Sequence, residues 1–372
     1  MNQTPGQRLQ TEILDPMKRE FVGKDEIIDL LGVCLLGGEN LFILGPPGTA
    51  KSALVLRLGE RLGGTAFNYL LTRFTEPNEL FGPFDIRRLR EGELVTNTDG
   101  MLTEGSLVFL DELLNANSAI LNSLLSALNE RTVPRGRERL KVRALAFIGA
   151  SNHLPEDDAL LALFDRFLLR VHCDNVEPAK LAQVLDAGWR LDQSPALPVS
   201  LTVDELRAEQ ARVRTVSLDA VRADYTALIA RVRQAGITVS DRRAVKLQRV
   251  VASSALLCGR AEARVCDLWV LRHIWHTEDQ REVLRALVNE FTAKDSDPAL
   301  RHPGAADSAA PDAEALARDL AWIEEKSASP DEHAVARDRL AILEGQLPWV
   351  ADSAHRETLT ARAKELWTKV GA

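Results

Sequence analysis

A glycine-rich segment between a strand-like run and a helix-like run most constrains how this chain folds. It reads Gly45-Pro46-Pro47-Gly48-Thr49-Ala50-Lys51-Ser52, follows the apolar run 41–44 and precedes a helical pattern that starts at Ala53. Glycines at two turn positions let successive N–H groups point into one concavity, and the helix start adds the positive end of its dipole. Lys51 can then reach the β- and γ-phosphates of a nucleotide, and the Ser52 hydroxyl can ligate Mg²⁺. A Gly-Pro turn that only joins strand to helix is the alternative, but the flanking elements favour a phosphate loop.

The segments around this loop predict a parallel sheet with helices on both faces, because strand-like and helix-like runs alternate from about residue 8 to residue 175. The predicted strands are 41–44, 65–71, 107–110, 144–150 and 167–173. Beyond residue 200, apolar residues recur at helical spacing, and a Gly/Pro-containing linker is expected over 186–202. We therefore expect an α/β domain over 1–190, a helical domain over 200–293, a linker over 295–312 and a helical C-terminal region over 313–372, in which Ser329-Pro330-Asp331-Glu332 predicts a helix start.

The composition excludes several functional classes. With 45% hydrophobic and 27% charged residues, the chain is typical of a soluble globular protein. Its net charge of −8 argues against nucleic acid or an anionic membrane as a general partner. No apolar signal core or membrane-spanning run is present, and the four cysteines (Cys34, Cys173, Cys258 and Cys266) form no CxxC motif. We expect a cytoplasmic protein with buried thiols and no histidine metal site, and we expect His273 and His276 to be packing or surface residues.

Two carboxylates and an amide follow predicted strands. Asp111 and Glu112 come directly after the run 107–110, and Asn152 follows the run 144–150. The carboxyl ends of parallel strands meet at one edge of the sheet, so these groups are expected beside the phosphate loop. There Asp111 would hold Mg²⁺ through water, Glu112 would polarise the attacking water, and Asn152 would orient that water or touch the γ-phosphate. A turn-forming role is the alternative for Asn152.

Two arginine positions are candidates for contacts with phosphate. Arg166 lies between a helical pattern and the predicted strand 167–173, where it could reach a neighbouring subunit's γ-phosphate and raise the hydrolysis rate by several powers of ten. A surface ion pair with Asp165 is the alternative. Arg242 and Arg243 fall in the first turn of a helix that Ser240 would cap, where a cation is unfavourable for the helix dipole. Phosphate binding would explain an arginine there.

The motifs, in this order, resemble those of the AAA+ ATPases and, within them, of the MoxR family, especially its RavA-like subgroup. The resemblance covers about residues 8–290. It is carried by Gly45–Ser52 with Ala50 where the common motif has glycine, Thr72–Pro77 leading to Leu80–Pro83, Phe109–Glu112, Leu121–Arg131, Ala150–Asn152, Asp165–Phe167 and Ser240–Arg243. The fold that it implies is an AAA+ α/β P-loop domain, followed by an all-α lid and a short C-terminal helical region.

The resemblance also implies a role for each motif. By similarity, Walker A includes Lys51 and Ser52, Walker B is Asp111 and Glu112, sensor 1 is Asn152, the arginine finger is Arg166, and sensor 2 is Arg242 with Arg243 as the competing choice. The nucleotide-binding set is then Val22, Gly23, Gly45, Pro46, Pro47, Gly48, Thr49, Ala50, Lys51, Ser52, Ala53 and Asp111, of which Ser52 and Asp111 would hold the metal. Val22 and Gly23 belong to the segment 21–24 that would pack against adenine.

Two basic loops are implied as well. The family's insertion before Walker B corresponds to residues 86–105, expected here as a β-hairpin with Arg87, Arg88 and Arg90 at its base. A further loop over 134–139 separates the helix that ends near Arg131 from the sensor strand. In a ring, both loops could face the central channel and grip a partner; solvated loop tips are the alternative.

The predicted function is ATP hydrolysis with Mg²⁺ in a ring of identical subunits, a hexamer, that remodels a partner protein. Relatives commonly act beside a von Willebrand A (VWA) domain partner and often assist metal or cofactor insertion. A nucleic-acid motor is an alternative, which the acidity and the aromatic content of only 5% disfavour. A nucleotide-dependent assembly scaffold that does not turn over ATP is a further alternative, ranked lower because all catalytic side chains are present.

Overall fold

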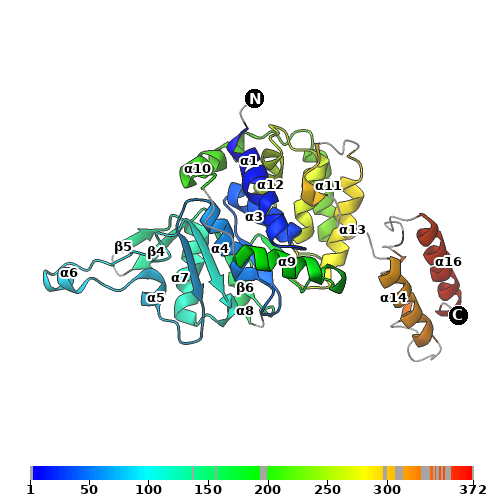
Figure 1. Cartoon of the computed structure of the whole chain (residues 1–372), viewed down its shortest axis with the longest axis horizontal. Helices are drawn as coiled ribbons and strands as arrows, with labels where there is room; N and C mark the ends of the chain where they lie inside the picture. The colour runs from blue at the N-terminus through cyan, green and yellow to red at the C-terminus, as the bar shows by residue number, and fades with distance from the viewer. Residues whose placement is uncertain are drawn as a thin grey trace. The chain divides into compact units, whose positions relative to one another are not determined.

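The computed structural model describes residues 3–372 except 136–137, 156, 193–198, 296–299, 306–312, 328–335, 338–339, 341–342, 345–346, 348–352 and 371–372. The chain forms two compact units, Met1–Ala305 and Ala306–Ala372. The larger unit contains a sheet, the helices that cover it and a helical lid, and all the candidate site residues belong to it (Figure 1).

A five-stranded parallel sheet is the centre of the larger unit (Figure 1). Its strands are β1 (Leu41–Leu44), β2 (Ala66–Leu70), β3 (Leu107–Asp111), β6 (Ala146–Ser151) and β7 (Leu169–His172), in the order β2-β3-β6-β1-β7. Strands β1, β3 and β6 are continuous apolar runs and are buried almost throughout, as expected for strands covered on both faces. All five predicted strands, and the predicted α/β class, are confirmed.

Helices cover the sheet and lead into it from the N-terminus. The chain begins with α1 (Pro5–Arg8), a π-helical turn (Leu9–Leu14) and α2 (Asp15–Glu20). The helix α3 (Asp25–Gly37) packs on β1 and β7, whereas α4 (Lys51–Arg61) packs on β2 and β3. Between β3 and β7 the chain adds a 3-10 turn (Leu113–Asn115), α7 (Ser118–Glu130) and α8 (Asp158–Phe164).

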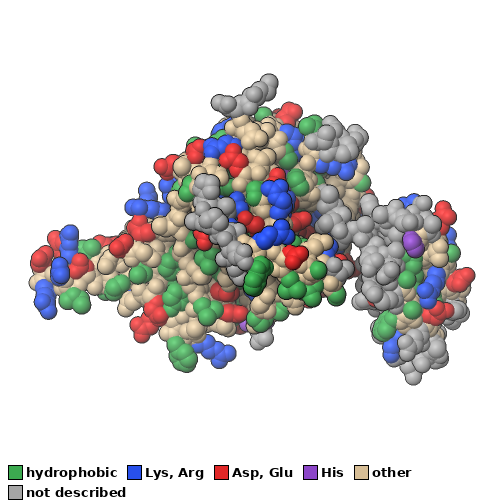
Figure 2. Space-filling model, in the orientation of Figure 1, with side chains coloured by type: hydrophobic (Ala, Val, Ile, Leu, Met, Phe, Trp, Pro, Cys, Tyr) green, Lys and Arg blue, Asp and Glu red, His purple; other side chains and the backbone are tan. Residues whose placement is uncertain are grey.

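The insertion before β3 is not the β-hairpin that we expected over 86–105. After α5 (Pro77–Phe81), residues 83–85 and 95–97 run antiparallel through a single bridge between Phe84 and Thr96, and the tip is the short helix α6 (Ile86–Arg90). The Asp85 carboxylate accepts hydrogen bonds from the backbone N–H of Arg87 and Arg88, which favours a helical turn. The arginines therefore lie at the tip and not at the base; Figure 2 shows Lys and Arg side chains gathered there, at the left of the view.

A true antiparallel hairpin lies instead where a loop was expected over 134–139. Strands β4 (Thr132–Arg135) and β5 (Glu138–Lys141) pair in register, with Val133 opposite Leu140. Arg135 of this hairpin donates to Asn78 and to the Gly82 carbonyl and lies over the Phe84 ring at 5.0 Å. The hairpin and the base of the insertion are thus packed together.

A 3-10 turn (Pro178–Lys180) and α9 (Leu181–Asp192) follow β7, and the lid predicted over 200–293 is helical. The elements from there to the end of the unit are α10 (Val203–Arg212), a 3-10 turn (Val213–Thr215), α11 (Arg222–Gln234), α12 (Asp241–Leu257), the 3-10 segment η5 (Val265–His273), α13 (Gln280–Thr292) and a final 3-10 turn (Pro303–Ala305). The linker expected over 186–202 is wrong in its first part, because α9 continues through Gly188 to Asp192; residues 193–198 lie outside the described residues.

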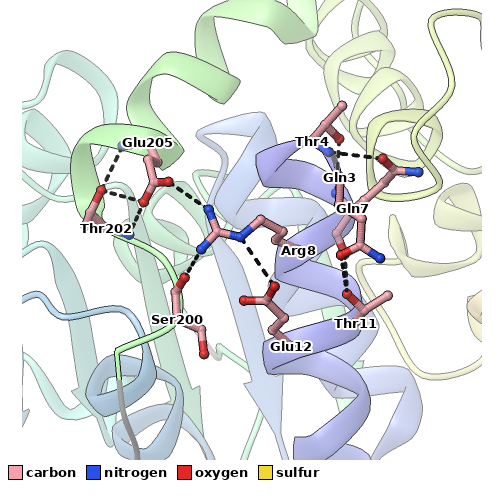
Figure 3. A network of polar contacts seen from close by, with 9 residues as sticks. All are labelled: Gln3, Thr4, Gln7, Arg8, Thr11, Glu12, Ser200, Thr202 and Glu205. Atoms are coloured by element: carbon pink, nitrogen blue, oxygen red, sulfur yellow. Dashed lines mark hydrogen bonds and ion pairs between the residues drawn. The ribbon is translucent and has the colours of Figure 1, made fainter. Parts of the chain in front are cut away.

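The start of α10 is tied to the N-terminal helix by a polar network (Figure 3). Thr202 and Glu205 form a capping box, and Glu205 also accepts a 2.8 Å hydrogen bond from Arg8. The Arg8 guanidinium donates to the Ser200 carbonyl and to Glu12 as well. Because α12 packs on α3 and α10 also contacts α3, the lid and the N-terminal helices form one continuous layer beside the sheet.

The smaller unit is helical. Its described helices are α14 (Ala313–Lys326) and α16 (Ser353–Val370), which share an apolar cluster containing Leu320, Ile323 and Leu366. The helix start predicted at 329–332 lies outside the described residues. In the described part of the chain, no helix combines the length and the apolar character that crossing a bilayer would require. The four cysteines are free; Cys34, Cys173 and Cys266 are buried as expected, but Cys258 is only partly buried.

Candidate functional site

The phosphate loop is shaped by residues that the backbone geometry requires. A side chain at Gly45 would bring its Cβ within 2.3 Å of the Cys173 carbonyl oxygen, so only glycine fits between β1 and the end of β7. Gly48 has a φ of +80°, and Ala50, in the position before the lysine, has a φ of +65°. Alanine in the left-handed region is strained, and such strain is typical of functional sites. The Cys173 thiol also donates to the Thr49 carbonyl, which ties the loop to the residue that directly follows β7.

Lys51 and Ser52 begin α4 and hydrogen-bond to different partners. The buried Lys51 ammonium donates to the carbonyls of Gly45 and Pro46, at 2.8 Å each. The Ser52 hydroxyl donates to Asp111 Oδ2 at 3.0 Å, which joins the loop to the end of β3. A hydroxyl and a carboxylate in contact form the hard-oxygen donor set that Mg²⁺ prefers, so the residues present fit this ion.

Glu112 and Asn152 complete this edge of the sheet. Glu112 adopts φ +49°, and its N–H donates to Asp111 Oδ1 at 3.0 Å. This left-handed turn directs the chain away from the strand directly after Asp111, and it is strained for a residue with a Cβ. Asn152 directly follows β6 and is exposed. The structure therefore brings together the predicted Walker A and Walker B residues and places Asn152 at the neighbouring strand end.

The predicted adenine-binding segment lies beside the same edge. Gly23 has a φ of +74° and faces Val176, and the Lys24 ammonium donates to the Asp174 carbonyl, just beyond β7. Glu20, which ends α2, accepts hydrogen bonds from Arg57 and Arg61 of α4, the latter at 2.7 Å. The segment 21–24 is thus tied to the helix that starts at Lys51. We did not anticipate Glu20, and no local sequence signal marks it.

The two candidate arginines lie at the opposite edge of the sheet. Arg166 precedes β7, and its carbonyl accepts a hydrogen bond from Asn40, which precedes β1. Strands of four residues separate this edge from the phosphate loop by at least about 13 Å. Arg166 is half-buried, and neither it nor the exposed Arg242 makes a side-chain hydrogen bond or ion pair within the described ranges. The structure therefore does not bring Arg166 or Arg242 to this chain's own phosphate loop.

Arg243, the competing choice for sensor 2, is part of the fold. It is buried and donates to the carbonyls of Leu168 and Ile274, to Asp165 and to His276 Nε2 at 2.6 Å. Burial lowers the pKa of Arg243 to about 10. Burial also lowers the pKa of His276, consistent with a neutral ring that accepts the arginine's hydrogen bond. Arg243 therefore fastens the lid to the start of β7 and leaves Arg242 as the accessible arginine.

Arg170 strengthens the same attachment. It is fully buried within β7, donates to the carbonyls of Phe164, Ile274 and Trp275, and stacks over the Phe164 ring at 4.1 Å. Its burial lowers its pKa well below the usual value. We did not single out this residue; the available signal was an arginine inside a run otherwise predicted as a buried strand.

A polar cavity of about 230 Å³ lies where the lid meets the carboxyl end of β7. Its lining includes His172, His273, Glu26, Glu278 and Trp275. His273 Nε2 lies 3.5 Å from Glu26 Oε1, and His172 Nε2 lies 3.5 Å from Glu278 Oε1. Burial lowers the pKa of His172, and lowers that of His273 to about 4. Among the residues described, no cluster of three His, Cys, Asp or Glu side chains has the geometry to hold a metal ion.

Comparison with known proteins identifies two family models. A model described as the MoxR domain of MoxR-vWA-beta-propeller ternary systems matches residues 7–211. A model described as an AAA lid domain matches residues 218–288. The matched ranges include all the candidate site residues named above.

Individual relatives agree with these matches. Two uncharacterized proteins of Methanocaldococcus jannaschii are 34% and 32% identical, over 76% and 75% of this chain and 74% and 81% of their own lengths. The chaperone MoxR1 of Mycobacterium tuberculosis is 24% identical over 52% of each chain. A crystal structure from Cytophaga hutchinsonii, of a protein proposed to be an ATPase, matches with a TM-score of 0.62 and covers 76% of this chain and 94% of its own. At 16% identity, that likeness concerns the fold alone.

Proposed function

This chain belongs to the MoxR family of AAA+ ATPases, and on that premise we propose that it hydrolyses ATP in a ring in which each subunit completes its neighbour's site. The observation that carries the proposal is the separation of the site into two halves. The phosphate loop and the carboxylates lie at one edge of the sheet, whereas Arg166 and Arg242 lie at the other, where neither side chain has a hydrogen-bond or ion-pair partner among the described residues. An arginine supplied by a neighbour is a known route to fast phosphoryl transfer.

The binding half is built by one chain. Backbone N–H groups between Gly45 and Lys51 would cradle the phosphates, and the Lys51 ammonium would exchange its loop carbonyls for phosphate oxygens. Val22 and Gly23 would pack against adenine at the end of α2. Mg²⁺, held by Ser52 and through water by Asp111, would neutralise charge between the β- and γ-phosphates. The remaining nucleotide contacts would come from the loop residues Pro46 to Ala53.

The hydrolytic half needs two chains. Glu112 would orient and polarise the attacking water, and Asn152 would hold that water or the γ-phosphate. Arg166 of the adjoining subunit would stabilise the charge that develops on the transferred group. Arg242 and Arg166 are the sequence neighbours of Arg243 and Asp165, which form an ion pair at this edge. We therefore propose that Arg242 also acts on the neighbour's nucleotide, and not on the nucleotide of its own chain as the sensor 2 assignment would imply.

The partner is proposed to be a protein with a VWA domain, and the task its remodelling or activation. The matching family model is named for MoxR-vWA-beta-propeller systems, and one relative is a chaperone, which support this choice. A hexameric ring and membership of the RavA-like subgroup remain predictions from the motifs. The four free cysteines fit action in the reducing cytoplasm.

Turnover measured against protein concentration tests the proposal. Specific ATPase activity should rise as rings form, because the phosphate loop of a lone subunit has no neighbour to supply Arg166 and Arg242. The Glu112→Gln variant should bind ATP with affinity within about twofold of the parent and lose at least about 100-fold in turnover. Glu130→Gln, which changes an exposed carboxylate outside the site, is the matched control and should behave as the parent.

Three outcomes would contradict the proposal. Activity independent of concentration would show a site complete in one chain. Assembly with ATP but no turnover in any preparation would favour a nucleotide-dependent scaffold. Stimulation by DNA with a steep salt dependence would revive the nucleic-acid motor.

A further inference from the structure

The helix α9 carries an apolar stripe that nothing in the described chain covers. Leu181, Leu185 and Trp189 follow one another at four-residue spacing, and 53%, 64% and 71% of their surfaces are exposed. Figure 2 shows hydrophobic side chains at the surface over this helix. A different face of α9 carries the buried Ala187 and the partly buried Leu191, which anchor the helix to the core. Large apolar side chains gathered on one exposed face mark an interaction surface.

The stripe adjoins the nucleotide edge of the sheet. The helix α9 packs against α2, at whose end the segment 21–24 begins. The residues that connect β7 to α9 include Asp174, whose carbonyl binds Lys24, and Val176, which contacts Gly23. A subunit that brings arginines to this phosphate loop must therefore approach close to α9.

The opposite edge carries matching apolar groups. Leu161 of α8 lies one turn before Asp165 and is 44% exposed. Val245 of α12 lies three residues after Arg242 and is 64% exposed. Two exposed apolar side chains thus flank the two arginines, which have no side-chain partner in the part of the chain that the structure describes.

We propose that the stripe of α9 is the docking surface for the α8 and α12 face of a second copy of this chain. This inference rests on the proposed function, because it is the delivery of Arg166 and Arg242 to the neighbour's phosphates that brings the two faces together. Charge favours the same pairing: the exposed carboxylates of Asp174 and Glu177 lead into α9, and the opposing face presents the two arginines. The contact is head-to-tail, so it builds a ring or an open helical filament and not a two-fold dimer; the proposed function requires the ring.

Assembly in the presence of ATP and Mg²⁺, followed by sedimentation velocity over a range of protein concentrations, tests the docking surface. Leu185→Ser and Trp189→Ser should each raise the concentration at half-assembly by about tenfold or more, because buried aromatic and aliphatic anchors dominate interface energies. Val283→Ser, a change at an exposed apolar residue of α13, is the matched control and should assemble as the parent. Binding of a fluorescent ADP analogue should stay within about twofold in all three, since the binding half of the site is within one chain.

A charge pair makes the test specific for the two faces. Leu185→Glu alone and Val245→Lys alone should each weaken assembly, and the chain with both changes should recover most of the loss through an ion pair across the interface. Thermal unfolding checks that each variant is folded; the side chains are exposed, so the midpoint should move little. Should Trp189→Ser prove unstable, Leu185→Ser and the charge pair carry the test.

The outcomes separate the two proposals. If the parent assembles and hydrolyses ATP while the stripe variants assemble equally well, the docking surface is wrong and the proposed function stands. The inference would likewise be wrong if the stripe variants assembled normally but no longer bound a different protein, because that protein would then be what binds the stripe. If the parent neither binds ATP nor assembles, the proposed function fails, and the inference fails with it.

Discussion

The polar side chains at the two edges of the central sheet differ in whether they have hydrogen-bond or ion-pair partners within the described part of the chain. At the carboxyl edge, Ser52 is bonded to Asp111, the Asp111 carboxylate also accepts from the Glu112 N–H, and Lys51 is bonded to its own loop. At the amino edge, Arg166 and Arg242 make no side-chain hydrogen bond or ion pair in the part of the chain that the structure describes. One edge holds its polar side chains in place, whereas the other carries two arginines without a side-chain partner among the described residues.

This difference predicts that nucleotide binding and ATP hydrolysis need different numbers of chains. Groups that are already in place lose little freedom when a ligand arrives, so one chain should suffice to bind a nucleotide. Charged groups without partners in their own chain gain most from a partner in another chain. The comparison therefore predicts that affinity belongs to the subunit and turnover to the assembly, and each experiment below tests one side of it.

Loss of Arg166 should have the largest effect. Arg166→Ala should bind ATP within about twofold of the parent and lose about 10³-fold in turnover, because the charge of the transition state would lack its neighbour's guanidinium. Steady-state kinetics and equilibrium binding measure the two quantities separately. Arg214→Ala, a change at another exposed arginine, is the control.

Mixed rings decide between a shared site and a local one. Lys51→Ala chains cannot hold ATP but keep Arg166, and Arg166→Ala chains keep an intact loop. Equal mixing at random would restore about a quarter of the interfaces. Rings verified to contain both chains and yet inactive would show that Arg166 does not act across the interface.

The adjacent arginines Arg242 and Arg243 should separate function from stability. Arg243→Ala would leave the Leu168 carbonyl without its arginine donor and the Ile274 carbonyl with Arg170 alone, and it should lower the free energy of unfolding by about 3 kcal/mol. Arg242→Ala should change stability by less than about 0.5 kcal/mol and reduce turnover by about tenfold or more. Urea unfolding and ATPase assays measure both. A destabilised Arg242→Ala would place that side chain within the fold and remove it from the shared site.

The sequence predicts best what local chemistry determines. The strands β1, β3 and β6 were found because each is an apolar run that must be buried. The strand β2, by contrast, lies at the edge of the sheet and is largely exposed. The spacing of the glycines with Lys51 and Asp111 predicts the binding edge directly. Contacts between distant segments were not accessible in this way. Arg170 reaches the Ile274 carbonyl 104 residues away, and the choice between Arg242 and Arg243 depends on which face of α12 meets β7.

Where local cues competed, the prediction was wrong. Basic residues followed by glycines over 86–105 were interpreted as a hairpin, although Asp85 can cap a helical turn at Ile86. The linker expected over 186–202 rested on Gly188, Pro195 and Pro198, of which Gly188 lies within α9, where a helix tolerates glycine at a cost of about 1 kcal/mol. In both cases turn-forming residues were given more weight than the helical pattern around them.

Acid should distinguish the lid's two attachments to β7, with the smallest of the expected effects. The arginines of the attachment at the amino end stay charged at any moderate pH, and the burial that lowers the pKa of His276 there is countered in part by its contact with Asp165. His273 at the carboxyl end is buried, packs edge-on against Trp269 and has a pKa lowered to about 4. The unfolded chain binds a proton on this histidine near pH 6.5 and the folded chain does not, so its contribution to stability is complete above pH 6.5 and is lost as the pH falls towards 4. Between pH 7 and pH 5 the loss should be about 2 kcal/mol.

Urea unfolding of the parent and of His273→Gln at pH 7 and pH 5 measures this contribution. The fall in the free energy of unfolding between the two pH values should be smaller in His273→Gln by about 2 kcal/mol, because the variant has no proton to release at that position on folding. His153→Gln, a change at an exposed histidine, should leave the fall unchanged. An equal fall in the parent and in His273→Gln would mean that His273 does not make the carboxyl-end attachment sensitive to acid.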